Sequence, residues 1–167
     1  MRIPRLKLYQ LIILALGAVL TIAGLIYTIV KYPGLPAEIP THYNFAGEID
    51  GYGGKGAIWV LEGVNLGIFI MMTAFIFFPA VIQNPSVTWR VDPMKRHILG
   101  AETISLLLEM SLLMVAFFDF MIYSTINTIA IGMWPTIVFV LLIFGTSIFR
   151  LIHMYRLTRI KKQPWER

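Results

Sequence analysis

Cysteine is absent from the 167 residues, and charged residues make up only 14% of them. The first absence excludes disulfides, iron–sulfur clusters, thiolate zinc sites and thiol nucleophiles. Hydrophobic residues reach 57%, whereas a soluble domain averages roughly 45 to 50% apolar and about 25% charged residues. This composition is typical of a chain that contacts lipid as well as water. Its length fits one domain of residues 1–167.

Four apolar runs are each long enough to cross the hydrocarbon layer of a bilayer, which takes about 20 residues of helix. The first run is longer than the apolar core of a cleaved signal peptide, so we interpret it as an anchor helix. No alternating ten-residue pattern favours a barrel. The sequence predicts an all-α polytopic membrane protein with helices at about 9–30, 57–82, 101–123 and 134–152.

The distribution of basic residues predicts the orientation, because Lys and Arg are retained in cytoplasmic segments. Twelve of the fourteen lie before the first run, between the second and third runs, or from Arg150 onward, in and next to a basic tail at 153–167. We therefore expect a multi-pass protein of the cell membrane with both termini in the cytoplasm. The basic surface suits anionic lipid, and we predict no nucleic-acid partner.

The loop at 31–56 then faces the outside. Three prolines disfavour helix, residues 41–44 are typical of a short strand, and Asp50-Gly51 is typical of a turn. Its apolar residues can pack on the helix ends. We expect an ordered, helix-free cap between the first two helices.

The loop carries a distinctive motif between Leu35 and Lys55: Leu-Pro-x-x-Ile-Pro-x-His-Tyr-Asn-x-x-Gly-x-x-Asp-Gly-Tyr-Gly-x-Lys. This motif resembles the loop signature of the SdpI-type bacterial and archaeal membrane proteins, a family otherwise described by domain of unknown function 1648. The resemblance extends over about residues 10–82, and beyond Ile82 it is one of topology alone. It implies a role in immunity against a secreted toxin or in signalling by sequestering a repressor at the membrane.

The motif supplies the first group of candidate ligand-binding residues, which are His42, Asn44, Asp50 and Lys55. One hypothesis joins His42, Glu48 and Asp50 around a divalent cation. The alternative is structural: Asp50 caps the turn, Lys55 pairs with Asp50, and His42 bonds to a backbone carbonyl. The structural alternative is favoured, so no metal and no other cofactor is predicted.

Acidic residues inside the expected helices form the second group of candidates. Inserting one at the centre of a membrane helix costs about 2.5 to 3.5 kcal/mol, and a cost of this size indicates a structural or functional role. Glu62 and Asn65 lie at about the depth of Asp119, and could form with it a polar pocket beneath the loop. That pocket could bind a proton, an ion or a peptide, or its residues could simply bond between helices.

Glu102, Ser105 and Glu109 form a polar stripe in the third run. Glu102 is interpreted as a charge favoured by the dipole at the start of its helix. Glu109 lies deeper. The basic residues at a similar depth, Lys95, Arg96, Arg150 and His153, are candidate partners.

Hydrolase motifs are absent, and we predict that the protein is not an enzyme. The leading hypothesis is a membrane receptor or immunity-type protein that binds an extracytoplasmic peptide or toxin. The alternatives are a small ion-coupled transporter component that uses the intramembrane carboxylates, and a scaffold subunit of a larger membrane complex. Besides the bilayer, the expected partners are a peptide and either a membrane protein or a second copy of the chain.

Overall fold

A computed structural model describes residues 6–78 and 95–158. Their elements are α1 (Leu8–Lys31), η1 (Tyr32–Gly34), β1 (Glu38–Tyr43), β2 (Ile49–Gly54), α2 (Ala57–Ala74), η2 (Phe75–Phe77), α4 (Arg96–Ile126) and α5 (Met133–Thr158). Within these residues four helices are long and apolar enough to cross a membrane. The prediction of an all-α polytopic membrane protein is confirmed.

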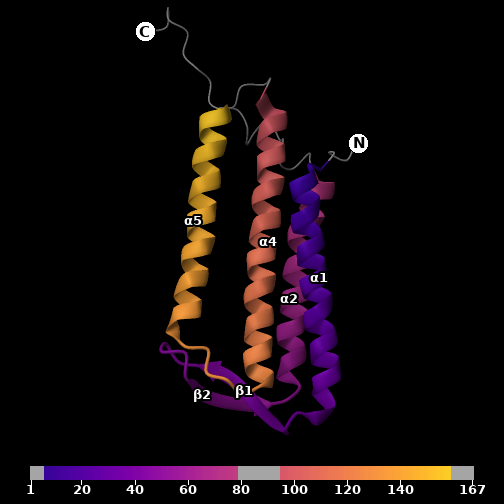
Figure 1. The fold of residues 1–167 in the computed structure, drawn as a ribbon, viewed down its shortest axis with the longest axis vertical. Helices are drawn as coiled ribbons and strands as arrows, with labels where there is room; N and C mark the ends of the chain where they lie inside the picture. Colours follow the sequence, from indigo (N-terminus) through magenta and orange to yellow (C-terminus); the bar gives the residue numbers. More distant parts are fainter. Residues whose placement is uncertain (1–5, 79–94, 159–167) are drawn as a thin grey trace, which may run out of the picture.

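The four long helices run up and down along one axis, and the β1–β2 hairpin lies across one end of the bundle (Figure 1). Helix α4 is central because α1, α2 and α5 all pack against it. Buried polar side chains along α4 include Glu102, Ser105 and Ser111. This central position explains why the third run can carry several polar residues, since these face protein.

Helix α5 packs chiefly on α4, and most of its other faces are exposed apolar side chains. Phe139 stacks on Phe117 of α4 with ring centroids 3.9 Å apart. Ser147 donates a hydrogen bond to the sulfur of Met110 at 3.6 Å. In a bilayer the remaining faces of α5 meet lipid, which is the solvent that their composition requires.

The helix ends differ from those expected. Helix α2 ends at Ala74 and continues only as the η2 turn, and residues 79–82 of the expected helix lie outside the described residues, as do 83–94 and 159–167. Helix α4 begins at Arg96, five residues before the expected start, and α5 runs to Thr158, past the expected end at 152. Arg150, the charge nearest the expected end of the fourth helix, pairs with Glu102 and Glu109 of α4 and does not interrupt α5.

The loop at 31–56 is ordered, but the expectation that it is helix-free is wrong. The η1 turn at Tyr32–Gly34 is closed by the Leu35 N–H, which donates to the Tyr32 carbonyl at 3.2 Å. Pro33 has no N–H and a fixed φ, so it fits the first turn of such a helix. The rest of the loop folds into the antiparallel hairpin.

The reversal of the hairpin lies at Asn44–Glu48, so the predicted turn at Asp50-Gly51 is wrong. Both residues are inside strand β2. The Gly47 N–H donates to the Asn44 carbonyl at 2.8 Å, and Gly47 has φ +79°. Glycine adopts that left-handed conformation without a steric cost, which fixes the reversal here.

The hairpin is anchored to the helices at both ends of its strands. Ile39 is buried against Ile58 of α2 and Ile122 of α4. At the tip, the Gly132 N–H of the α4–α5 connection donates to the Gly47 carbonyl at 3.1 Å. A Cβ on Gly47 would lie 2.3 Å from the Gly132 backbone, so this contact requires glycine. The hairpin is therefore a fixed cap over α2, α4 and α5.

Candidate functional site

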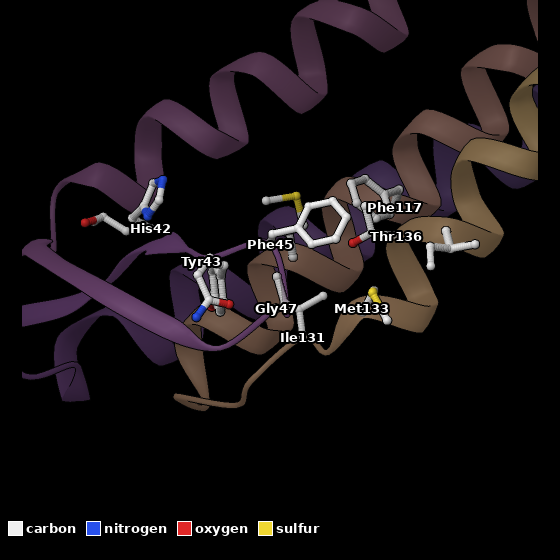
Figure 2. A pocket seen from close by; sticks show the side chains of 12 residues that line it. His42, Tyr43, Phe45, Gly47, Phe117, Ile131, Met133 and Thr136 are labelled. Atoms are coloured by element: carbon white, nitrogen blue, oxygen red, sulfur yellow. The ribbon is translucent and has the colours of Figure 1, made fainter.

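A cavity of about 400 Å³ lies where the hairpin meets the hairpin-side ends of α4 and α5. Figure 2 shows Phe45 of the hairpin beside Phe117 of α4 and Thr136 of α5. The lining is Thr41, His42, Tyr43, Asn44, Phe45, Gly47, Phe117, Met121, Ile131, Met133, Thr136 and Ile137. Most of this surface is apolar or aromatic. We call this space the cap cavity.

Phe45 is the most exposed part of that lining, with 92% of its surface accessible. A second cavity, of about 280 Å³, lies between the hairpin and α2, and Tyr43 and Met121 line both cavities. The Tyr43 hydroxyl lies 3.3 Å from Thr125 Oγ1 on α4. Tyr43 therefore lies between the cap cavity and the second apolar cavity, both beneath the hairpin.

Three of the four loop candidates, His42, Asp50 and Lys55, have partners other than those expected. His42 Nδ1 lies 2.5 Å from Asp50 Oδ1 across the hairpin, so His42 does not bond to a backbone carbonyl and Asp50 is not a turn cap. The Lys55 ammonium lies 5.0 Å from the centroid of the Tyr32 ring instead of pairing with Asp50. Of the four, His42 and Asn44 line the cap cavity.

Asn44 organises the turn through its side chain. Its Oδ1 accepts from the Glu48 N–H at 3.0 Å, and its Nδ2 donates to Glu48 Oε2 at 3.0 Å. Glu48 therefore bonds to Asn44 and not to the His42–Asp50 pair. Among the residues described, no three His, Cys, Asp or Glu side chains are grouped to hold a metal ion.

The acids near the hairpin form a second feature, which we call the unpaired-acid cluster: Thr28 of α1, Glu62 and Asn65 of α2, and Asp119 of α4. The Thr28 hydroxyl donates to Glu62 Oε1 at 2.5 Å, and Asn65 Nδ2 donates to Asp119 Oδ1 at 2.8 Å. Glu62 is 5% exposed and Asn65 is fully buried.

The cluster is distinct from the two cavities beneath the hairpin, because neither of them is lined by Glu62, Asn65 or Asp119. Gly24 of α1 explains how the acids fit between helices. A Cβ at Gly24 would lie 2.4 Å from Asp119 Oδ1, so only glycine admits this carboxylate.

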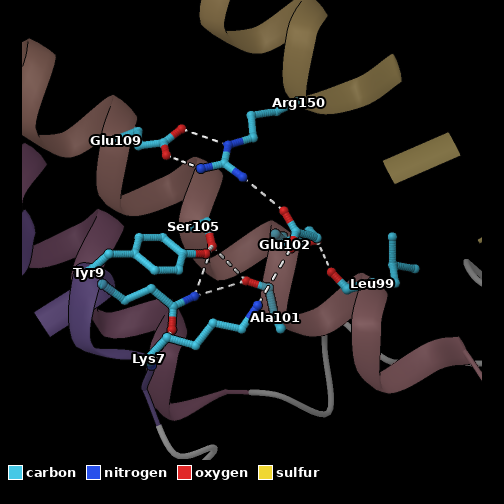
Figure 3. Close-up of polar contacts among 10 residues, drawn as sticks. Lys7, Tyr9, Leu99, Ala101, Glu102, Ser105, Glu109 and Arg150 are labelled. Atoms are coloured by element: carbon cyan, nitrogen blue, oxygen red, sulfur yellow. Dashed lines mark hydrogen bonds and ion pairs between the residues drawn. The ribbon is translucent and has the colours of Figure 1, made fainter. Parts of the chain in front are cut away.

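A third feature lies at the opposite end of the bundle, where Arg150 of α5 meets two acids of α4. Its Nε donates to Glu109 Oε2 at 2.8 Å and one terminal nitrogen donates to Glu109 Oε1, while the other donates to Glu102 Oε2 at 2.8 Å (Figure 3). Lys7, the residue before α1, lies 3.8 Å from Glu102. We call these four residues the arginine cluster.

The arginine cluster corrects the interpretation of Glu102, which lies almost two turns inside α4 and is not at its start. Its charge is compensated by Arg150 and Lys7. Ser105, on the same stripe, bonds to the Tyr9 hydroxyl at 2.6 Å and accepts from Gln10 Nε2 at 2.8 Å. Of the basic candidates whose side chains the structure describes, which are Lys95, Arg150 and His153, Arg150 pairs with these acids.

Sequence reasoning missed several residues that build these clusters. Gly24 and Thr28 are residue types common in membrane helices, Lys7 precedes the first run, and Gln10 is a lone polar residue near its start. A usable signal was the spacing of Gly24 and Thr28, which are four residues apart and so share one helix face. That spacing shows a face suited to close packing, but not which helix packs there.

Residues 19–66 match the family model described as "Domain of unknown function (DUF1648)". The matched segment begins within α1, contains the whole hairpin and ends within α2. No curated protein and no solved structure matches the chain. The cap and the α1 and α2 parts of the unpaired-acid cluster thus belong to a segment similar to that domain, whereas Asp119 and the arginine cluster lie beyond it.

Proposed function

We propose that the protein is a non-enzymatic membrane receptor that binds an apolar segment of an extracytoplasmic peptide in the cap cavity. The observation that carries this proposal is the aromatic and apolar lining of that cavity, between a fixed hairpin and two helix ends. Ligand sites in proteins are concave, mostly apolar and supplied with a few polar groups. His42, Asn44 and Thr136 are such polar groups here.

The distribution of charge supports the orientation that this function needs. Lys7, Arg150 and Arg156 lie toward the helix ends opposite the hairpin, while the hairpin end holds Lys31 and Lys55 together with acids such as Glu38. Basic residues stay on the cytoplasmic side of a membrane. We therefore place the protein in the cell membrane with both termini in the cytoplasm and the cap cavity outside.

The SdpI-type resemblance of the loop motif supports a peptide as the ligand and immunity or signalling as the role. The exposed Phe45 ring at the cavity mouth offers an aromatic surface to an incoming apolar side chain. Aromatic residues supply large contact area with few rotatable bonds, which is why they dominate binding surfaces. The second cavity beyond Tyr43 would take a neighbouring side chain of the same peptide.

A direct binding experiment tests the proposal with defined probes. The full chain is placed in lipid nanodiscs, and fluorescent decapeptides of Ser and Gly are added that carry none, one or two Phe–Leu pairs. We expect saturable binding, measured by fluorescence anisotropy, that strengthens with each pair. Binding of all the peptides to protein-free nanodiscs with the same strength as to loaded ones would refute the proposal.

Two tryptophan variants of α5 provide the matched control. Thr136→Trp fills the cap cavity, whereas Val140→Trp adds the same side chain to an exposed position outside its lining. We expect Thr136→Trp to weaken binding at least roughly tenfold, because lost burial of one large apolar side chain is worth that much. Val140→Trp should bind as the wild type does, and equal loss in both variants would contradict the site.

A further inference from the structure

We propose that the unpaired-acid cluster binds one hard, oxygen-seeking metal cation between Glu62 and Asp119. This site is separate from the cap cavity and does not depend on peptide binding. Counted from the hairpin-side helix ends, Glu62 lies five residues into α2 and Asp119 seven residues from the end of α4. At 1.5 Å per residue, the cluster lies roughly 8 to 10 Å below those ends.

Charge balance is the first argument. Glu62 and Asp119 lie among three membrane-spanning helices, and their hydrogen bonds are to the neutral groups of Thr28 and Asn65. Within the described part of the chain, no Lys, Arg or His pairs with either acid. Charges buried in protein are paired or coordinate metal ions, because isolated ones are too costly. Two acids without a base therefore need a positive charge beside them, which either a proton or a metal cation can supply.

The chemistry of the donors is the second argument. The cluster offers only oxygen donors: two carboxylates, the Thr28 hydroxyl and the Asn65 carbonyl, which is the ligand type that Na⁺, Ca²⁺ and Mg²⁺ prefer. The Asn65 Oδ1 atom is fully buried and has no hydrogen-bond partner. Because Nδ2 of the same amide bonds to Asp119, Oδ1 lies within a few ångströms of that carboxylate. An oxygen left without a donor in this position is a free ligand for a cation.

The arrangement of the helices is the third argument. Thr28, Glu62 and Asp119 come from three different helices, and Gly24 leaves space for Asp119 to reach the other two. Because Glu62 and Asn65 are three residues apart, they share one face of α2. A cation here would tie α1, α2 and α4 together below the hairpin. Without it, mutual repulsion of the carboxylates would loosen the same contact.

Thermal unfolding of the purified full chain in detergent tests the proposal. Melting curves are recorded in CaCl₂, MgCl₂, NaCl and choline chloride at equal ionic strength, at pH 6 and pH 8. We expect a higher Tm in at least one metal salt than in choline chloride, since ligand binding to the folded state stabilises it. The Ca²⁺, Mg²⁺ and Na⁺ arms identify the ion. A Tm that follows pH but is equal in all four salts would mean that protons alone occupy the site, and would overturn the proposal.

Variants localise the response. Glu62→Gln and Asp119→Asn each remove a carboxylate ligand while keeping the side-chain shape, and should raise the half-saturating cation concentration by at least roughly tenfold. Glu48→Gln removes an exposed carboxylate of the hairpin and should leave it unchanged. An unaltered response in both cluster variants would place any cation elsewhere and overturn the proposal.

Asn65 separates a ligand role from a packing role. Asn65→Leu keeps the size but removes the free oxygen, so the cation response should fall. Asn65→Asp adds a carboxylate and should retain or strengthen the response, whereas a purely structural asparagine would lose stability in every salt. Should the variants not fold, equilibrium dialysis of wild-type protein with radioactive Ca²⁺ or Na⁺ decides: we expect one ion per chain, and none would refute the site.

Discussion

The arginine cluster and the unpaired-acid cluster each contain two carboxylates, but a basic side chain balances the acids only in the arginine cluster. Each places two carboxylates between spanning helices, and α4 contributes to both. In the arginine cluster a guanidinium donates to both acids, with Lys7 near one of them. In the unpaired-acid cluster the donors are a hydroxyl and an amide.

This difference separates a structural role from a binding role. Arg150 donates charge-assisted hydrogen bonds to both Glu102 and Glu109, and its pairing with Glu109 is bidentate, so each carboxylate has a charged partner. These ion pairs attach α5, the helix with the fewest buried side chains, to α4. The unpaired acids already lie where α1, α2 and α4 pack closely, so their charge is not needed to hold a loose helix. An uncompensated pair in such a place is a candidate site.

The largest expected effect comes from removing the compensation. Arg150→Leu would strand Glu102 and Glu109 without their guanidinium, and breaking a buried ion pair in this way costs about 3 to 5 kcal/mol. We expect a sharp loss of folded protein after extraction and a lower midpoint of thermal unfolding in nanodiscs. The arginine cluster would then resemble the unpaired one.

A compensated variant provides the control for that result. Combining Arg150→Leu with Glu102→Gln and Glu109→Gln removes the stranded charges, so most of the lost stability should return. If Arg150→Leu alone is as stable as the wild type, the arginine cluster does not hold α5. If the triple variant is no better than the single one, the loss comes from packing and not from charge.

The next effect concerns the fit of the unpaired acids. Gly24→Ala introduces a Cβ 2.4 Å from Asp119 Oδ1, so the carboxylate or the helix must move. Overpacking of this kind costs about 1 to 3 kcal/mol. We expect a lower unfolding midpoint and a weaker cation response in the same melting experiment.

The same substitution at Gly63 of α2 is the matched control, because a Cβ there meets no atom within 4 Å. Alanine is a better helix former than glycine, so Gly63→Ala should be neutral or slightly stabilising. In an Asp119→Ala background the cost of Gly24→Ala should largely vanish. Equal destabilisation by both glycine substitutions would show that helix flexibility, and not the carboxylate, is what matters.

The sequence predicts the spanning helices well because their signal is local. A run of about 20 apolar residues predicts a membrane-spanning helix without information from any other segment. It also shows that acids such as Glu62 and Asp119 need an explanation. The sequence could not predict their neighbours Thr28 and Gly24. These are common residues of membrane helices, and their role is evident only once the facing helix is known. Arg150 was found as a candidate partner because charge and depth can be counted along the chain.

The outer loop was predicted less well than the helices, because the position of its turn is decided by tertiary contacts. Asp50-Gly51 is a common turn pair, but Asn44 and Gly47 compete with it and have more bonds. Asn44 makes two side-chain bonds to Glu48, and the Gly47 carbonyl accepts from Gly132 on a distant connection. The last of these contacts depends on α4 and α5. Residue statistics within the loop therefore favour the wrong reversal.

The smallest expected effect tests this account of the hairpin. Asn44→Ala removes two side-chain hydrogen bonds at the reversal, each worth about 0.5 kcal/mol, the low end of the usual range, because both are exposed. Asp50→Ala removes a contact to His42, whose side chain is 72% exposed, and pairs this exposed contribute little. Hydrogen exchange of the amides at 38–54 should therefore accelerate more in Asn44→Ala than in Asp50→Ala. The reverse order would restore Asp50 as the residue that fixes the turn, since a cap at Asp50-Gly51 would make its loss the more damaging one.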